Sequence, residues 1–138
     1  MNTNFSYQTS LRVRYGETDQ MGYCYYGNYA QYFEVGRVET LRALGMSYKE
    51  LEHQGIMLPV SELNVRYKNP AKYDDALLIC TTIVAITGSR IQFEYTITNE
   101  EGTLICGGFT TLVFVSKSTM KPIRPPENFM KIVSPFEV

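Results

Sequence analysis

The chain has 138 residues, of which 44% are hydrophobic and 20% charged, and its net charge is −1 at neutral pH. This length suits one domain with its own core and is too short for two, so we expect a single domain over residues 1–138. The near-neutral charge provides no global attraction to nucleic acid or to an anionic membrane. The longest run without a charged residue, 102–116, contains glycine, threonine and serine and is shorter than a membrane helix. The first ten residues lack a basic segment followed by an apolar one, so no secretory signal is predicted.

The cysteine and histidine counts exclude several kinds of site. Three cysteines occur without a CxxC pair, and Cys80 and Cys106 lie in apolar runs typical of small buried hydrophobic residues. Unpaired thiols fit a reducing cytoplasm, where we expect the protein to reside. His53 is the single histidine, and no HExxH spacing is present, so we expect no metal site.

The first part of the chain predicts one strand and two helices. Residues 8–15 alternate between apolar and polar side chains, as a half-buried strand does, and residues 16–27 form a loop with three glycines. A long helix then begins with Asn28 as its cap, has apolar residues at three- and four-residue spacing, and ends at Gly45. Residues 47–55 predict a short second helix.

From residue 56 onward the apolar period is two, which predicts strands. Tight connections at Thr87-Gly88 and at residues 99–102 make the last three strands antiparallel. Gly107-Gly108 indicates a bulge or a close approach by another segment. The final twenty residues include four prolines and are expected to form a tail over the surface. The predicted strands are 60–67, 76–86, 90–98 and 103–116.

One long helix among five strands predicts an α+β domain in which an antiparallel five-stranded sheet wraps around the helix. Such a sheet leaves two edges open. Pairing edges between subunits closes them, so we expect a homodimer or a homotetramer.

Asp19 is the main candidate for chemistry. As an aspartate near glycine it has a simpler interpretation as a turn-former. However, aromatic residues surround it in the sequence, and partial desolvation by them would raise the basicity of its carboxylate. It also precedes a helix N-terminus, whose free N–H groups can stabilise a developing oxyanion. The other possible nucleophile–base pair is Cys24 with His53, although His53 fits a solvated residue near a helix C-terminus.

Two segments resemble a known family. Residues 14–45, RYGETDQMGYCYYGNYAQYFEVGRVETLRALG, strongly resemble the hotdog-fold acyl-CoA thioesterases of the 4-hydroxybenzoyl-CoA thioesterase family. Residues 65–83, VRYKNPAKYDDALLICTTI, resemble the strand–PA–aspartate–strand segment that follows in that family, and the likeness extends over residues 11–116. The family pattern has an aspartate, a glycine three residues later, an aromatic segment ending in Asn-Tyr, and a helix with Glu-x-x-Arg. The matching positions are Asp19, Gly22, Tyr25, Tyr26, Asn28, Tyr29, Glu34 and Arg37.

The resemblance implies roles for individual residues. Asp19 is the catalytic carboxylate, as nucleophile or general base, and the backbone N–H groups of Tyr26 and Gly27 are the oxyanion donors. Many relatives have histidine at the position of Tyr26, and others have tyrosine. The predicted substrate-binding residues are Met21, Gly22, Tyr25, Asn28, Val60 and Ser61. Asn28 has the alternative role of helix cap, and the alternative for the apolar pocket residues near Met21, Tyr25 and Val60 is an ordinary place in the core. Glu34 and Arg37 are expected to form a salt bridge.

Basic residues near strand ends and loops are candidates for the CoA phosphates. For each one, the alternative is an ordinary solvated surface charge. The first group is Arg66, Lys68 and Arg90, followed by Lys72, Lys117, Lys121 and Arg124.

The resemblance therefore implies an acyl-CoA thioester hydrolase that releases a free acid and CoA, with no cofactor beyond the CoA of its substrate. Two alternatives remain open at this point: an acyl-CoA or acyl-carrier-protein binding module without hydrolysis, and an acyl-carrier-protein thioesterase. Hotdog dehydratases are disfavoured because His53 does not match the place of their histidine.

Overall fold

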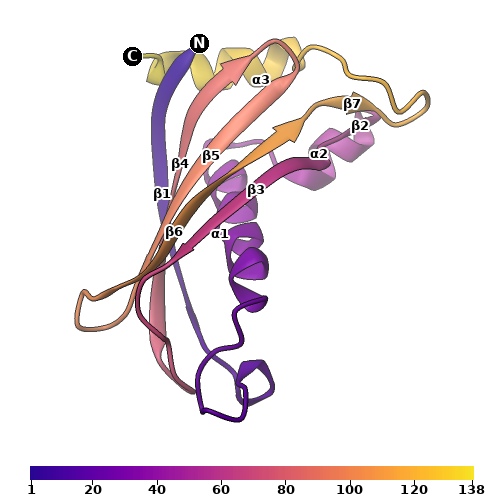
Figure 1. The fold of residues 1–138 in the computed structure, drawn as a ribbon. Helices are drawn as coiled ribbons and strands as arrows, with labels where there is room; N and C mark the ends of the chain where they lie inside the picture. Colours follow the sequence, from indigo (N-terminus) through magenta and orange to yellow (C-terminus); the bar gives the residue numbers. More distant parts are fainter.

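The computed structural model describes residues 1–138 and has an antiparallel five-stranded sheet curved around one long helix (Figure 1). The strand order is β1-β4-β5-β6-β3, which leaves β1 and β3 at the two edges. This arrangement confirms the predicted α+β hotdog fold. The strands of this sheet are β1 (Asn2–Arg12), β3 (Val60–Tyr67), β4 (Ala76–Thr87), β5 (Arg90–Thr98) and β6 (Leu104–Val113).

Helix α1 (Asn28–Leu44) packs its apolar side against the sheet. The predicted end is confirmed: Gly45 follows the helix at φ 106°, a conformation that glycine adopts without strain. The predicted cap is wrong by one residue. Gly27 occupies the N-cap position, and the Asn28 side chain makes no capping hydrogen bond. It turns instead toward the preceding loop, which fixes the entry of the chain into the helix.

The second predicted helix is confirmed as α2 (Tyr48–His53), with the Ser47 hydroxyl accepting a hydrogen bond from the Glu50 N–H. The C-terminal tail differs from the expectation, because it contains α3 (Glu127–Val133) and a short 3-10 helix (Ser134–Phe136). The side chains of Phe129 and Val133 are fully buried, so this helix closes the apolar interior rather than crossing the surface.

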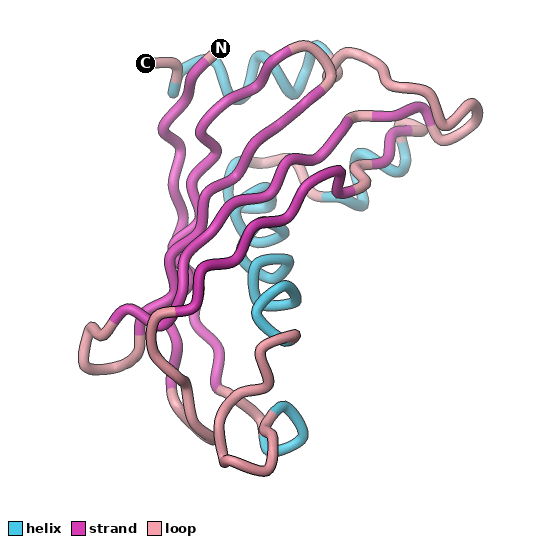
Figure 2. Tube along the Cα trace, viewed as in Figure 1, coloured by secondary structure: helices cyan, strands magenta, loops and turns pink.

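Two other expectations shift in the structure. The first strand lies at Asn2–Arg12, and a 3-10 turn (Tyr15–Glu17) follows it. The predicted strand at 103–116 is two strands, because β7 (Val115–Ser116) leaves the main sheet and pairs with β2 (Ile56–Met57). Loops gather at the two ends of the sheet (Figure 2).

The glycine pair in β6 marks a close approach and not a bulge, since the register continues through Gly107 and Gly108. A Cβ atom at Gly108 would collide with the Asn64 carbonyl oxygen and would lie 3.1 Å from the Phe33 ring. Phe33 in turn stacks on Tyr95 with ring centroids 4.2 Å apart. Glycine at position 108 therefore lets the helix and the sheet pack closely.

The loop that includes Asp19 lies at one end of the sheet, and both chain termini lie at the other (Figure 1). The Met1 ammonium group donates to the Ile86 carbonyl at 2.8 Å, and the Val138 N–H donates to the Asn2 carbonyl at 3.0 Å. None of the helices combines the length and the apolar character that crossing a membrane would require.

Candidate active site

Asp19 opens a tight turn whose backbone orients its carboxylate. Oδ1 accepts hydrogen bonds from the N–H groups of Met21 at 2.9 Å and Tyr23 at 3.2 Å. The Asp19 N–H donates to the Tyr23 carbonyl, and Gly22 completes the turn at φ 78°. Oδ2 makes no hydrogen bond within the chain, so one oxygen is fixed and the other is free to react. Asp19 is exposed in the single chain. The partial desolvation expected for its carboxylate is therefore absent there.

A pocket of about 300 Å³ lies beside Asp19 and has aromatic walls. The Tyr67 ring, at the end of β3, stands 6.2 Å from the Tyr26 ring and 5.7 Å from the Tyr29 ring, centroid to centroid. The pocket therefore joins three elements: the Asp19 loop, the first turn of α1 and the edge strand. It is lined by Asp19, four tyrosines (23, 26, 29 and 67), Cys24 and residues 68–70.

Two unused N–H groups lie at the start of α1, next to this pocket. The amides of Tyr26 and Gly27 donate to no protein acceptor. Each of these N–H groups shares a peptide bond with the carbonyl of the preceding residue, and both carbonyls are held by hydrogen bonds. The Tyr25 carbonyl accepts from the Asn28 N–H at 3.0 Å, and the Tyr26 carbonyl accepts from the Tyr67 hydroxyl at 3.4 Å. Free N–H groups at a helix N-terminus stabilise negative charge, so the pair is suited to an oxyanion.

Glycine at position 27 has a packing reason. A Cβ atom there would lie 2.7 Å from the ring of Tyr25, so a side chain would displace this ring. Tyr25 packs on Tyr26 with centroids 4.6 Å apart. The loop therefore packs closely against the residues that present the two N–H groups.

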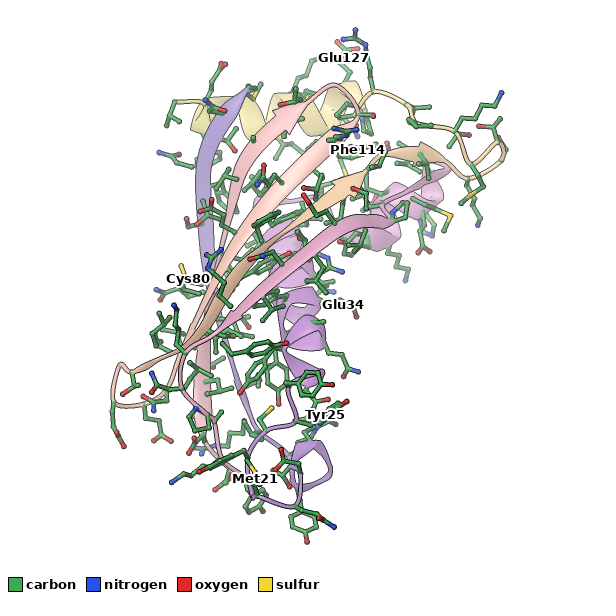
Figure 3. The ribbon with its side chains drawn as sticks, viewed as in Figure 1. Met21, Tyr25, Glu34, Cys80, Phe114 and Glu127 are labelled. Carbon is green, nitrogen blue, oxygen red and sulfur yellow. The ribbon has the colours of Figure 1, made fainter.

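The structure places several predicted substrate-binding residues outside this pocket. Met21 is 71% exposed on the loop at the Asp19 end of the molecule (Figure 3). Tyr25 does not line the pocket and packs on Tyr26. Gly22 serves the turn. The Asn28 side chain donates to the Glu17 carbonyl at 2.8 Å, so its contact is with the loop and not with the pocket.

Val60, Ser61 and Arg90 lie at the other end of the sheet within one chain. Val60 pairs with Leu112, which pairs with Ile91, whereas Tyr67 at the Asp19 end pairs with Cys106. Val60 borders a separate groove beside α1. A single chain therefore does not bring these three residues to Asp19.

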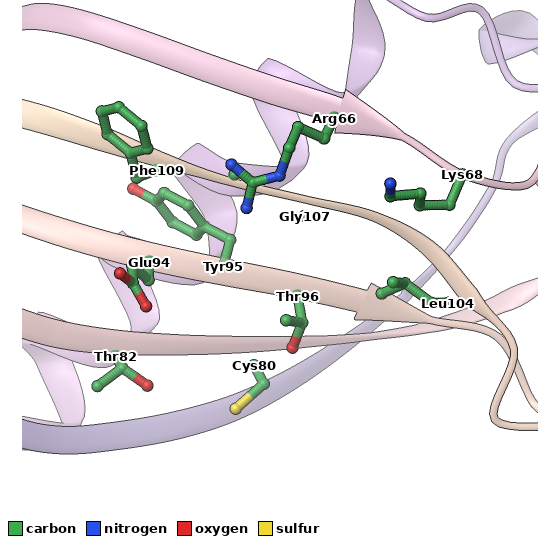
Figure 4. A pocket seen from close by; sticks show the side chains of 11 residues that line it. Arg66, Lys68, Cys80, Thr82, Glu94, Tyr95, Thr96, Leu104, Gly107 and Phe109 are labelled. Carbon is green, nitrogen blue, oxygen red and sulfur yellow. The ribbon is translucent and has the colours of Figure 1, made fainter.

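Of the predicted phosphate-binding residues, Lys68 lines the Asp19 pocket. Arg66 and Lys68 also border a hollow of about 420 Å³ on the outer face of the sheet, over Gly107 (Figure 4). Cys80 faces this hollow and is half-buried, so its expected burial in the core is wrong. Cys106 is buried as expected, and this burial raises the pKa of its thiol to about 12.

The alternative Cys24–His53 pair is excluded by the fold. Cys24 lies before the start of α1 and His53 lies beyond its end, and the 17 residues of this helix separate the two by about 25 Å. Cys24 is buried, which raises the pKa of its thiol and disfavours the thiolate. The predicted Glu34–Arg37 salt bridge is present at 3.9 Å, and Arg37 also donates to the Tyr48 hydroxyl at 3.1 Å.

Glu17 was missed by the sequence analysis. Its side chain is 12% exposed and accepts from the Arg14 N–H at 2.9 Å, the Arg14 guanidinium at 3.1 Å and the Tyr32 hydroxyl at 2.9 Å. Burial would raise the pKa of this carboxyl, but the hydrogen bonds from Arg14 and Tyr32 together outweigh burial and lower it. Its place two residues before Asp19 was the only available signal, since Tyr32 is distant in sequence.

Comparisons with known proteins agree with this geometry. The family model described as the thioesterase-like superfamily matches residues 13–133. A putative acyl-CoA thioesterase of Bacillus subtilis, YneP, is 36% identical over 114 residues, which cover 83% of each chain. The acyl-CoA thioester hydrolase YbgC of Escherichia coli is 32% identical over 130 residues, covering 94% of this chain and 96% of that protein. The crystal structure of a DHNA-CoA thioesterase from Staphylococcus aureus superposes with a TM-score of 0.90 at 38% identity, covering 94% of this chain and 89% of that one.

Proposed function

The chain belongs to the thioesterase-like superfamily, and from this premise we propose that it is an acyl-CoA thioester hydrolase with Asp19 as its catalytic carboxylate. It hydrolyses acyl-CoA to a free carboxylic acid and CoA, as its relatives' names describe. The single observation that carries the assignment of the site is the free Oδ2 of Asp19 beside two unpaired N–H groups at a helix start. No cofactor beyond the CoA of the substrate enters this proposal.

The chemistry follows from the placement of these groups. The thioester carbonyl oxygen faces the N–H groups of Tyr26 and Gly27, which stabilise the negative charge that develops on it. Asp19 either takes a proton from an attacking water or attacks the carbonyl carbon itself, forming an anhydride that water then opens. In both routes the carbon–sulfur bond breaks, CoA leaves as its thiol after gaining a proton, and one water is consumed to give the free acid.

The walls of the pocket favour a flat acyl group. Four tyrosines surround about 300 Å³, and aromatic rings pack well against one another in edge-to-face and offset arrangements. A relative with 38% identity is a DHNA-CoA thioesterase by its description. We therefore propose an aromatic acyl-CoA as the preferred substrate over a long-chain one.

We further propose that two copies pair through β3. This strand is an open edge, and Val60, Leu63 and Tyr67 on it are each at least 45% exposed. Antiparallel pairing of two β3 strands centred on Leu63 would set Val60 of the partner subunit opposite Arg66, next to Tyr67. The partner's Ser61 and Arg90 would then approach the Asp19 end, which supports the roles predicted for all three residues.

Light scattering tests this pairing directly. We expect a mass at least twice the 15.8 kDa of one chain, and a Leu63→Glu variant should dissociate and lose turnover because it places like charges across the new edge. A monomeric wild-type protein with full turnover would overturn the pairing.

The three unpaired cysteines support a cytoplasmic location, which we propose as well.

The decisive experiment measures released CoA by chromatography for aromatic, short-chain and long-chain acyl-CoA, because a thiol dye would also react with the cysteines. Wild type should turn over the aromatic ester best. Asp19→Asn should lower kcat by about 100-fold or more, while its Tm and its binding of the ester stay unchanged. Asp74→Asn is the matched control, since Asp74 is another exposed loop aspartate, away from the pocket.

Full turnover by Asp19→Asn would reject Asp19 as the catalytic group. Wild type that binds acyl-CoA without releasing CoA would instead favour the binding module, and hydrolysis of an acyl-carrier-protein thioester alone would favour the third alternative.

A further inference from the structure

Glu17 has more hydrogen bonds than a surface carboxylate needs, and none of them is used by the reaction described above. Its side chain joins Arg14, at the end of the first strand region, to Tyr32, one turn into α1. Its backbone carbonyl accepts from the Tyr25 N–H and from the Asn28 side chain, both at 2.8 Å. Four neighbours from three segments of the chain therefore converge on one residue.

These contacts lie at the base of the Asp19 loop. Thr18 pairs with Cys24 as an isolated antiparallel bridge, and Asp19 pairs with Tyr23 within it. The Tyr25 N–H donates to the Glu17 carbonyl, which closes this small loop at its base. Glu17 thus directly precedes the segment that carries Asp19, and it is hydrogen-bonded to Tyr25, which directly precedes Tyr26 and Gly27.

Helix α1 provides the fixed reference for this base. Tyr32 is buried, and its ring packs edge-on against Tyr29 with centroids 5.8 Å apart. Burial raises the pKa of the Tyr32 hydroxyl, so it remains a proton donor to the Glu17 carboxylate. A rigid donor on the helix therefore sets the position of a carboxylate on the loop.

We propose that Glu17 is a positioning residue for thioester hydrolysis, which holds Asp19 and the amides of Tyr26 and Gly27 in one arrangement by fastening the loop to α1. The inference rests on the proposed function. Glu17 does not line the Asp19 pocket and has no contact with the reacting atoms. It acts through geometry, and displacements of about 1 Å at a reacting centre can cost about 100-fold in rate.

The test compares variants of Glu17 that change the length of the side chain and its charge separately. Glu17→Asp keeps the charge and shortens the side chain by one methylene, so it should lose the Tyr32 contact and lower kcat by about 10- to 100-fold. Glu17→Gln keeps the length and an acceptor oxygen, so kcat should fall by less than about 10-fold. KM should change by less than about twofold in both variants, because the pocket walls are unaltered.

Glu39 provides a matched control, since it forms an i,i+3 pair with Arg42 on α1, just as Glu17 does with Arg14. Glu39→Gln should leave kcat unchanged. Tyr32→Phe should lower kcat about as much as Glu17→Asp, and the double variant of these two changes should be no worse than the more impaired single variant, because both changes break the same contact. The pH profile of kcat should keep its shape in Glu17→Gln, whereas loss of its acidic limb would make Glu17 a general base and overturn the proposal.

Unchanged kcat in Glu17→Asp or in Tyr32→Phe, with active wild type, would overturn the positioning role alone. Equal losses in Glu17→Asp and Glu39→Gln would also overturn it, because the effect would then be one of general stability. Absence of turnover in wild type on every ester would reject the proposed function, and the positioning role with it.

Discussion

The middle of the sheet and its Asp19 end are built in different ways. In the middle, α1 packs so closely that Gly36 and Gly108 leave no space for a methyl group, and Phe33 stacks on Tyr95. At the Asp19 end the aromatic rings are partly exposed, and the backbone is positioned by hydrogen bonds to Glu17, Tyr23 and Tyr67. Steric fit determines the packing of the middle of the sheet, whereas hydrogen bonds determine the backbone positions at the Asp19 end.

The difference teaches where each kind of change should be detected. A steric change in the middle raises the energy of the native packing, so it should appear as lost stability. A polar change at the Asp19 end leaves the core intact and displaces a few reacting groups, so it should appear mainly as lost rate, with a smaller loss of stability. Three predictions test this separation.

The largest expected effect is on stability. Gly108→Ala should destabilise the fold by about 3 kcal/mol, because its Cβ would collide with the Asn64 carbonyl of the neighbouring strand. Gly107→Ala is the control, since its Cβ would lie 3.3 Å from the Tyr95 carbonyl and needs only a small shift. Thermal unfolding followed by circular dichroism measures both. Equal Tm values for Gly108→Ala and Gly107→Ala would contradict the claim that steric fit determines the stability of this region.

A smaller effect should depend on pH. The pKa of Glu17 is lowered in the folded protein because hydrogen bonds outweigh burial. Its ionised form therefore stabilises the fold above the ordinary glutamate pKa of about 4.3, and this contribution is lost as pH falls through the lowered value. Wild type should exceed Glu17→Gln in stability by about 1 kcal/mol at neutral pH, and the Tm difference should shrink in acid. A difference that is constant from about pH 7 to about pH 3 would contradict the ion pairing at this end.

The smallest effect is expected at Met21. Its side chain is exposed at the loop tip and does not line the pocket, so Met21→Ala should leave both kcat and Tm within about 1.5-fold and 1 °C of wild type. Loss of turnover with unchanged Tm would show that Met21 meets substrate, as the sequence analysis predicted, or meets a partner subunit.

Strong periodicity made much of the fold predictable. The strands at Val60–Tyr67 and Arg90–Thr98 lie where the alternation of apolar residues placed them, and α1 ends at Gly45. The start of β1 was missed because residues 2–7 are mostly polar on an edge strand, where one-sided burial is weak. The helix at Glu127–Val133 was missed because nearby prolines suggested a tail, although Phe129, Met130 and Val133 have helical spacing.

The candidate site was less predictable for a physical reason. Asp19 and the N–H groups of Tyr26 and Gly27 follow from a local motif, and the structure brings them together. Which tyrosines line the pocket depends on how the loop turns, so Tyr25 was expected inside while Tyr67, from a distant strand, was not. The role of Glu17 depends on a contact across 15 positions, which no local pattern reveals.

The adjacency of the two chain ends has a practical consequence. Met1 and Val138 are fixed to neighbouring strands at the end of the sheet opposite Asp19. Within one chain, a purification tag, a fluorescent reporter or a surface tether attached at either end therefore lies away from the Asp19 pocket. A short flexible linker can also join the two ends, so that new ends can be opened at the Asn99–Gly102 hairpin.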